Sequence, residues 1–330
     1  MKSAVRIGVV GAGRMGIGIA QVFAYAGYPV ELIDVKDRSE EESSRVLEDA
    51  KRQIRNSLLF LSTLGLLNER AVRSVEERIG YHSQGAIASA LRQTDVVFEA
   101  VPEVMEIKRD AIARMNAAVR PDTMIASTTS TFLVNALAEY VKGPERFLNT
   151  HWLNPAYLIP LVEVSPGEKT DPEITRNMLS LLEEAGKVPV TCAPSPGFIV
   201  PRIQALAMNE AARIVQEGVA SAEDVDKASR VGFGVRFAVL GLLEFIDWGG
   251  GDILYYADRY LQGALGSDRF APPSVIEENM STGKIGMKTG EGFYDFTNRD
   301  LNAYQQETLR KFVDLLRHLN LLPKPGEDFA

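Results

Sequence analysis

The feature that most constrains the fold is a glycine-rich turn near the start of the chain, Gly11-Ala12-Gly13-Arg14-Met15-Gly16. An apolar run, Arg6–Val10, precedes this turn, and a segment with helical periodicity, Met15–Tyr25, follows it. A second apolar run, Val30–Ile33, then ends in Asp34. A strand, a GxGxxG turn, a helix and a second strand in this order are typical of a βαβ unit that binds a dinucleotide.

Each part of this turn has a physical role in such a site. The first glycine, Gly11, allows the tight turn, Gly13 lets the backbone approach a pyrophosphate, and Gly16 lets the helix pack closely on the strand. The start of the helix, at Arg14 and Met15, then faces the negative charge of the phosphates. The sequence predicts that these positions contact the cofactor.

The identity of the dinucleotide is predicted from Asp34. A carboxylate at the end of the second strand accepts hydrogen bonds from the adenosine ribose and repels a 2′-phosphate. NAD is therefore favoured over NADP, although Lys36 lies near enough to weaken that preference. The alternative is a glycine turn that only permits close packing of a helix on a strand.

Length and composition narrow the class of protein. A chain of 330 residues suggests two domains, and 45% hydrophobic with 24% charged residues excludes a disordered or collagen-like protein. The net charge of −8 makes binding to nucleic acid or to anionic membranes unfavourable. No segment has the length of a transmembrane helix or a signal peptide, and the single cysteine, Cys192, suits a reducing compartment. We expect a cytoplasmic protein.

The first half of the chain alternates strand-like and helical segments, which predicts an α/β fold with a Rossmann-type doubly wound sheet. The last strands are closely spaced, so that end of the sheet is expected to be mixed. A charged helical excursion occupies about residues 40–77. The expected strands are Val5–Val10, Val30–Asp34, Val96–Ala100, Thr123–Ser127, Phe147–His151, Leu161–Ser165 and Val188–Cys192.

A linker rich in proline and glycine, Ala193–Gly197, ends the strand pattern. An all-helical C-terminal domain is expected after it. The predicted domains are residues 1–193, which bind NAD, and residues 194–330, which bind substrate and form a dimer. The expected helices of the second domain are Ile199–Gln216, Ala222–Val231, Phe237–Ile246, Asp252–Leu261, Ser274–Ser281 and Leu301–Leu319.

Polar motifs follow several of the expected strands, where ligands bind in sheets of this kind. They are Glu99-Ala100-Val101-Pro102-Glu103 with Lys108, Thr128-Thr129-Ser130, His151-Trp152-Leu153-Asn154-Pro155, and Leu161-Val162-Glu163-Val164. Their order resembles that of the L-3-hydroxyacyl-CoA dehydrogenase family. The resemblance continues through Pro196–Val200 and Thr289–Tyr294 and covers nearly the whole chain.

The resemblance implies catalytic roles for four residues. His151 matches the catalytic histidine, Glu163 the carboxylate that orients it, Ser130 the serine that holds the substrate oxygen, and Asn154 the asparagine beside the nicotinamide. The chemistry agrees, because oxidation of a secondary alcohol needs a base for the hydroxyl proton and imidazole is a suitable base near neutral pH. The resemblance calls for no metal ion.

The resemblance also implies cofactor contacts by Asp34, Glu103 and Lys108. Simpler interpretations stay open at several positions. Glu103 and Lys108 could be solvated charges of a helix, and Ser130 could cap the helix that begins near Thr131. The other two histidines, His82 and His318, are interpreted as structural residues.

Two departures from the family pattern concern the substrate. Pro201 stands where the family commonly has an asparagine that reaches the substrate, and Asn209 on the same expected helix is a candidate substitute. The segment Gly232–Phe237 is more similar to the branch that contains L-gulonate 3-dehydrogenase, or λ-crystallin, which acts on free hydroxy acids. Arg236 in that segment suits a free carboxylate, or a carboxylate within a dimer.

Three functions therefore compete. The first is NAD-dependent oxidation of an L-3-hydroxyacyl-CoA such as 3-hydroxybutyryl-CoA, which the resemblance favours. The second is oxidation of a free hydroxy acid or another small alcohol by the same catalytic pair. The third is a binding or structural protein without turnover, against which the joint presence of Ser130, His151, Asn154 and Glu163 argues. The resemblance implies a homodimer, to which the apolar segment Leu240–Gly249 is expected to contribute.

Overall fold

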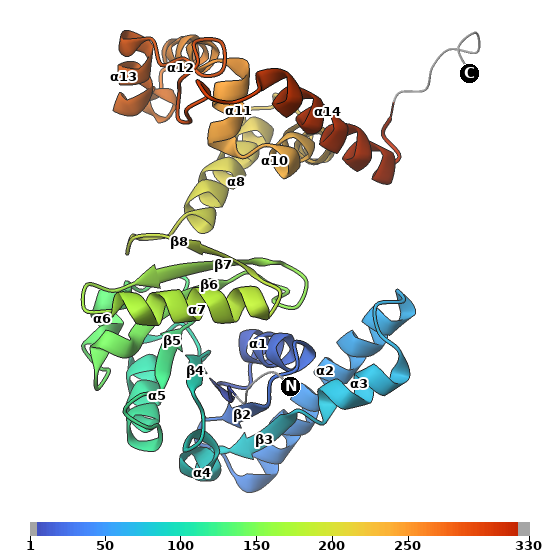
Figure 1. The fold of residues 1–330 in the computed structure, drawn as a ribbon, viewed down its shortest axis with the longest axis vertical. Helices are drawn as coiled ribbons and strands as arrows, with labels where there is room; N and C mark the ends of the chain where they lie inside the picture. Colours follow the sequence, from blue (N-terminus) through green and yellow to red (C-terminus); the bar gives the residue numbers. More distant parts are fainter. Residues whose placement is uncertain (1–4, 323–330) are drawn as a thin grey trace. The chain divides into compact units, whose positions relative to one another are not determined.

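The computed structural model describes residues 5–322, which form two compact units, one up to Ala207 and one from Met208 onward. The first unit contains an eight-stranded sheet in the order β3-β2-β1-β4-β5-β6-β7-β8 (Figure 1). The strands are β1 (Ile7–Val10), β2 (Val30–Asp34), β3 (Ile79–Ser83), β4 (Val96–Glu99), β5 (Met124–Ser127), β6 (Phe147–Trp152), β7 (Leu161–Pro166) and β8 (Val188–Thr191).

The strands from β3 to β6 pair in parallel, whereas β7 runs antiparallel to β6 and parallel to β8. The expectation of a mixed end to the sheet is therefore confirmed. The edge strand β3 was not expected from the sequence. Only its first residue, Ile79, is buried, and Gly80 interrupts its pattern, so it lacks the apolar run that marks the other strands.

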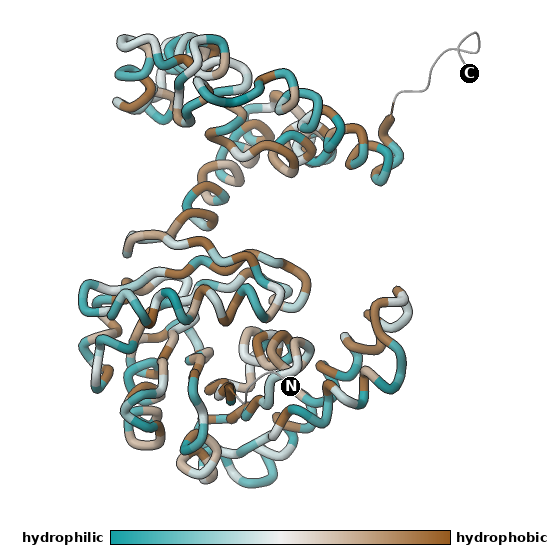
Figure 2. The backbone as a smooth tube through the Cα atoms, viewed as in Figure 1, coloured by the Kyte–Doolittle hydropathy of each residue, from teal (hydrophilic) through white to brown (hydrophobic). Residues whose placement is uncertain are grey.

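Helices cover both faces of this sheet, which makes it doubly wound. One apolar core joins the sheet to α1 (Arg14–Tyr25), α2 (Glu40–Thr63), α3 (Glu69–Glu76) and α7 (Pro172–Glu184). The other core joins it to α4 (Ile87–Leu91), α5 (Met105–Ala118) and α6 (Val134–Ala138). Figure 2 shows hydrophobic residues along the central strands, between these two layers.

The expected helical excursion is the pair α2 and α3. Ser39 caps α2: its side chain accepts a hydrogen bond from the backbone of Glu42, and the Glu42 carboxylate accepts one from the backbone of Ser39. Three glutamates in the first turn also suit the positive end of the helix. On its buried side, Ile54 and Leu58 pack into the first core.

The second unit is helical, as expected. The helix α8 (Val200–Gln216) begins in the first unit and ends in the second. It is followed by α9 (Ala222–Ala228), a π-helical segment (Ser229–Gly234), α10 (Val235–Val239), α11 (Leu242–Gly249), α12 (Gly251–Leu265), α13 (Ser274–Thr282) and α14 (Leu301–His318). The fold class predicted from the sequence is thus confirmed.

One expected helix, Phe237–Ile246, is divided into two. Leu240 and Gly241 have extended backbone between α10 and α11, and the Glu244 carboxylate accepts a hydrogen bond from the Gly241 backbone at 3.3 Å. Leu240 is buried although its backbone is not helical. The apolar pattern of the sequence therefore continues through the break without interruption. Burial without helical geometry explains why periodicity did not reveal the division.

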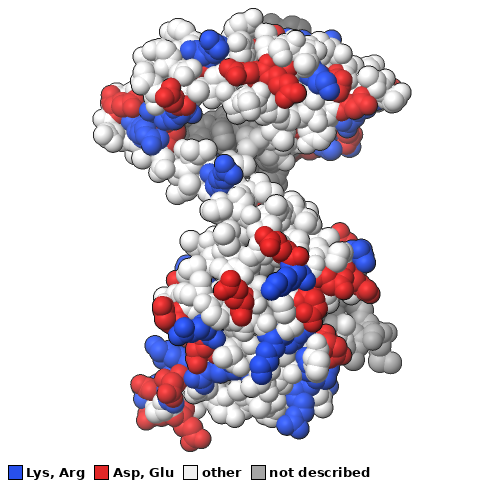
Figure 3. Space-filling view, turned by 90° about the vertical axis from the view of Figure 1, so that its left-hand side faces the viewer, with Lys and Arg blue, Asp and Glu red and all other residues white. Residues whose placement is uncertain are grey.

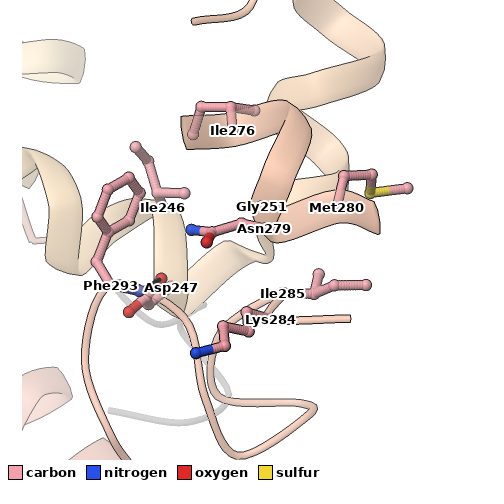
Figure 4. A pocket seen from close by; sticks show the side chains of 9 residues that line it. All are labelled: Ile246, Asp247, Gly251, Ile276, Asn279, Met280, Lys284, Ile285 and Phe293. Carbon is pink, nitrogen blue, oxygen red and sulfur yellow. Dashed lines mark hydrogen bonds between the residues drawn. The ribbon is translucent and has the colours of Figure 1, made fainter. Parts of the chain in front are cut away.

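The motif Thr289–Tyr294 has a structural role in the second unit. The buried Asp247 accepts hydrogen bonds from the backbone N–H groups of Phe293, at 3.0 Å, and Tyr294, at 2.8 Å. A Cβ atom at Gly292 would lie 2.2 Å from the Asp247 carboxylate and 2.8 Å from the backbone Cα atom of Gly286, so glycine is favoured there. The cavity beside these residues measures about 10 Å³, which at most admits a water molecule (Figure 4).

The surface carries mixed charge. On the face drawn in Figure 3, Lys and Arg side chains lie next to Asp and Glu side chains over both units. Within residues 5–322, no helix combines the length and the apolar character that crossing a membrane requires.

Candidate active site

The glycine turn packs tightly against backbone at two of its three glycines. Gly11 has a φ of +119°, and a Cβ atom there would lie 2.5 Å from the Ala100 carbonyl oxygen. A Cβ atom at Gly16 would lie 1.8 Å from the Gly11 carbonyl oxygen. Gly13, in contrast, faces open space. The turn therefore packs on one side and leaves room on the other, where α1 begins at Arg14.

Asp34 lies at the end of β2 and is 4% exposed. Its Oδ2 atom accepts a hydrogen bond from the Ser43 hydroxyl at 3.2 Å and lies 3.2 Å from Nε of Arg38. The cation beside the carboxylate is thus Arg38, whereas the sequence pointed to Lys36. A carboxylate at this position suits the adenosine ribose of NAD, and the positive charge next to it is that of Arg38.

A buried ion pair lies where β4 and β5 end. Nζ of Lys108, on α5, is 2.9 Å from Oε1 of Glu99, and both side chains are at most 1% exposed. Glu99 also accepts a hydrogen bond from the Ser127 hydroxyl at 2.6 Å. Because Lys108 is buried, it is not a solvated helix charge. Its ammonium also lies 3.3 Å from Glu103.

Glu103 joins this pair to the loop that carries Ser130. Its carboxylate accepts hydrogen bonds from the Thr129 hydroxyl and, at 2.9 Å, from the Thr131 backbone. Burial acts to raise the pKa of Glu103, but the Thr129 hydrogen bond and the Lys108 charge lower it overall. Ser130 itself is exposed and caps no helix, because α6 begins only at Val134.

His151 and Glu163 form the centre of the site. They are opposite each other on β6 and β7, and Nδ1 of His151 lies 2.6 Å from Oε2 of Glu163. The histidine is 6% exposed and the glutamate 1%. An ionised carboxylate only accepts, so in the neutral imidazole Nδ1 carries the proton of this hydrogen bond and Nε2 is the proton acceptor. This is the arrangement that a general base needs.

Asn154 lies in the loop after β6 and is exposed. Together with Arg14 it lines a groove of about 270 Å³ between α1, α2 and this loop. Arg14 is the one charged side chain of the lining, and the buried Gln21 contributes an amide group whose nitrogen has no hydrogen-bond partner. The groove therefore presents polar donors and a single positive charge beside the site.

The two expected substrate residues of the second unit are not placed relative to His151. Asn209, on α8, and Arg236, on α10, are both exposed. The Arg236 guanidinium lies over the Phe245 ring at 5.7 Å. Within the described part of the chain, it has no carboxylate at ion-pair distance, and no group of His, Cys, Asp and Glu side chains could hold a metal ion.

The sequence analysis gave no role to three residues near the site: Arg38, Glu99 and Lys187. Glu99 could have been found, since a carboxylate in the apolar strand β4 needs a buried partner just as Glu163 does. Lys187 had no such signal. It is 7% exposed and its ammonium donates to the carbonyls of Ala156 and, at 3.0 Å, Ile159, which fixes the loop that carries Asn154. Burial lowers the pKa of Lys187.

Two family profiles match this chain. The profile of the 3-hydroxyacyl-CoA dehydrogenase NAD binding domain matches residues 6–195. The profile of the 3-hydroxyacyl-CoA dehydrogenase C-terminal domain matches residues 197–296.

Individual relatives differ in their substrates. The chain is 34% identical over 291 residues to a probable 3-hydroxybutyryl-CoA dehydrogenase of Deinococcus radiodurans, covering 88% of this chain and 100% of the relative. It is 32% identical over 314 residues to 5-formyl-3-hydroxy-2-methylpyridine 4-carboxylate 5-dehydrogenase of Mesorhizobium japonicum, covering 95% and 97%. A crystal structure of 3-hydroxyacyl-CoA dehydrogenase from Archaeoglobus fulgidus is similar with a TM-score of 0.75 at 30% identity, covering 96% of this chain and 100% of that one.

Proposed function

Because this chain belongs to the 3-hydroxyacyl-CoA dehydrogenase family and is an NAD-dependent oxidoreductase, we propose that it oxidises the 3-hydroxyl group of an L-3-hydroxyacyl-CoA, such as 3-hydroxybutyryl-CoA, to a ketone. The observation that carries this proposal is the buried contact between His151 and Glu163. It leaves one imidazole nitrogen free to accept a proton at the polar end of the sheet.

In the proposed reaction, Nε2 of His151 accepts the proton of the substrate hydroxyl. The carbon–hydrogen bond of the same carbinol breaks, and its electron pair leaves with the hydrogen as a hydride. NAD supplies the acceptor for that hydride, at C4 of the nicotinamide ring. Glu163 then stabilises the imidazolium by the short hydrogen bond to Nδ1.

The remaining site residues orient the two reactants. We assign Ser130 to the substrate oxygen and Asn154 to the boundary between substrate and nicotinamide. Glu103 and the buried Lys108 keep the loop of Ser130 in place, since Glu103 binds the residues on both sides of that serine. We keep the glycine turn and Asp34 as cofactor contacts. For Glu103 and Lys108 we propose support of the Ser130 loop in place of the expected cofactor contact, because Lys108 is buried between Glu99 and Glu103.

The decisive experiment compares substrates. NADH formation is measured by absorbance with L-3-hydroxybutyryl-CoA, with free L-3-hydroxybutyrate and with L-gulonate, at equal concentrations. The proposal expects kcat/KM for the thioester to exceed that for either free acid by at least about tenfold, a barrier difference of about 1.4 kcal/mol. A higher value for a free acid would overturn the choice of thioester but retain the catalytic pair.

A free carboxylic acid is the second candidate substrate. The relative from Mesorhizobium japonicum, which aligns over 95% of this chain, is named for a carboxylate substrate. The exposed Arg236 has no ion-pair partner among residues 5–322, and Pro201 offers no amide. Both favour an anionic group on the substrate over a neutral thioester carbonyl.

We also propose that the enzyme is a homodimer. The helix α8 has no buried residue, and Leu206 and Met208 are 68% and 69% exposed. On α12, Ile253, Tyr256 and Tyr260 form a second exposed apolar row. Apolar surfaces of this kind mark interfaces, and two-fold symmetry is the commonest solution.

Sedimentation tests this directly, with twice the chain mass of 36.3 kDa expected. Tyr260→Glu should shift the equilibrium toward monomer, and a monomer at micromolar concentration in the unmodified protein would contradict the proposal. The cytoplasmic location stays a prediction from the single thiol of Cys192.

A further inference from the structure

The segment Pro196–Val200 belongs to the motifs of the chain, yet nothing in the proposed reaction uses it. Its central residue, Phe198, has a φ of +45°, in the left-handed region. Its N–H donates to the Ser195 carbonyl at 3.1 Å, so the turn is hydrogen-bonded in this conformation. A bulky residue adopts this region at a cost that glycine avoids. The Phe198 side chain therefore contributes a contact that offsets the cost of its backbone.

That contact is with the imidazole of His151. The Phe198 ring is stacked on the His151 ring, with centroids 5.4 Å apart and planes inclined by 25°. Phe198 is only 6% exposed, so this face of the imidazole is closed to water. Glu163 contacts the Nδ1 edge of the imidazole at the same time. The orientation of the ring is therefore fixed by Glu163 at one edge and by Phe198 on one face.

The two residues after Phe198 bind the other member of the pair. The backbone N–H groups of Ile199 and Val200 donate to Oε1 of Glu163, at 2.9 and 2.8 Å. The Oε2 atom of Glu163 is the one that contacts His151. Three consecutive residues, the last of which begins α8, thus contact the catalytic pair: Phe198 contacts His151 through its ring, and Ile199 and Val200 contact Glu163 through their backbone.

We propose that Phe198 is a positioning residue for the catalytic base. By stacking, its ring fixes the plane of the His151 imidazole, so that Nε2 points to the substrate hydroxyl. Phe198 touches neither substrate nor cofactor in this proposal. The inference rests on the proposed role of His151 as the base, and it adds the residue that sets the orientation of that base.

Three substitutions at this position distinguish the effect of the Phe198 ring on kcat from the effect of the backbone conformation. Phe198→Tyr keeps a stacking ring, Phe198→Leu keeps apolar bulk without a ring, and Phe198→Gly suits the backbone but removes the side chain. A misplaced catalytic group costs up to about 100-fold in rate, so we expect kcat to fall about 10- to 100-fold in the leucine and glycine variants. The tyrosine variant should stay within about threefold of the parent, since its ring can stack in the same way.

Two readouts distinguish positioning from a general loss of structure. NADH affinity, measured by fluorescence, should stay within about twofold in all three variants, and KM should change far less than kcat. Phe296→Leu removes a ring that is equally buried, in the second unit, and serves as the matched control with unchanged kcat. If the leucine variant unfolds, the glycine variant still tests the ring, because glycine relaxes the backbone.

Nuclear magnetic resonance reports the contact itself. The chain has three histidines, so labelling with ¹⁵N-histidine gives three imidazoles, and His151→Gln identifies the signal of interest. Loss of the Phe198 ring should move the His151 imidazole shifts and the pH profile of kcat, while the signals of His82 and His318 stay in place.

The outcomes separate this inference from the function on which it rests. Full kcat in both Phe198→Leu and Phe198→Gly, with an inactive His151→Gln, would overturn the positioning role alone. An active His151→Gln would overturn the proposed function, whatever Phe198 does.

Discussion

His151 on β6 and Glu163 on β7 are direct partners in an antiparallel ladder, and their side chains meet at 2.6 Å from Nδ1 to Oε2. Side chains of opposed residues in such a ladder lie on the same face, with Cβ atoms about 5 Å apart. The strand register alone therefore delivers the carboxylate to the imidazole. A parallel β7 would need a crossover of about a dozen residues or more, and only residues 153–160 connect β6 to β7.

Replacing His151 by glutamine should abolish turnover without removing the cofactor site. Loss of a general base costs about 10²- to 10⁴-fold in kcat, and no contact of the glycine turn involves this residue. Steady-state kcat and NADH affinity are measured on the same preparation. His82→Gln is the matched control, because His82 forms a similar 2.6 Å contact with Glu31 at the far edge of the sheet. A kcat above about one tenth of the parent would mean that another group takes the proton.

Glu163→Gln should reduce kcat through the imidazole tautomer. The amide oxygen can still accept from Ile199 and Val200, which directs the amide nitrogen to Nδ1 of His151. An amide donor at Nδ1 places the imidazole proton on Nε2, which then cannot accept one. We expect a loss of about 10²- to 10⁴-fold in kcat, comparable with loss of the base. Glu31→Gln, which makes the same change in the other histidine–glutamate contact, should leave kcat unchanged.

Cofactor selectivity should depend on both Asp34 and Arg38. We expect kcat/KM for NAD to exceed that for NADP by at least about tenfold, because the Asp34 carboxylate repels a 2′-phosphate. Asp34→Ala should lose this preference, since it also frees Arg38 to bind that phosphate. Adding Arg38→Leu to Asp34→Ala should remove the gain with NADP. Equal use of both cofactors by the parent protein would contradict the expectation.

Stability should depend on pH through Glu103. Its pKa is lowered in the folded protein, so it stabilises the fold above its ordinary value of 4.5, and this contribution disappears as pH falls through the folded-state pKa. Glu103→Gln should therefore be less stable than the parent at pH 7, and the difference should shrink below about pH 4.5. Urea unfolding of both proteins at a series of pH values measures this difference in the free energy of unfolding. Glu106→Gln, at an exposed position on α5, is the control. A difference independent of pH would contradict this.

The sequence was most informative where one residue type alone satisfies the geometry. Gly11 and Gly16 are positions where any Cβ would collide with backbone, and they identified the dinucleotide-binding domain correctly. The choice of NAD, which rested on Asp34, is also confirmed. The family, the fold class and the mixed end of the sheet were confirmed as well. These features rest on local spacing along the chain, which a single sequence displays.

The features that the sequence did not reveal depend on contacts between distant segments. Phe198 belongs to the motif Pro196–Val200, for which the sequence indicated no role, and only the fold brings its ring to His151. Glu99 finds Lys108 only once α5 folds back on β4. The strand β3 was missed because an edge strand with one buried residue lacks a periodic signal. The roles of Asn209 and Arg236 stay predictions.

The last prediction concerns the residue that binds the substrate carboxylate. A substitution of Arg236 distinguishes the two candidate substrates. If the substrate is a free acid, Arg236→Leu should raise KM strongly, because a charge-assisted hydrogen bond is about twice as strong as a neutral one. An uncharged ester of the same acid should be affected much less. If the substrate is a CoA thioester, the substitution should change stability or the monomer–dimer equilibrium with little specific effect on KM. Arg230→Leu, an exposed arginine of the preceding π-helical segment, is the matched control. An unchanged KM for the best acid in a folded dimeric variant would exclude Arg236 as the carboxylate partner.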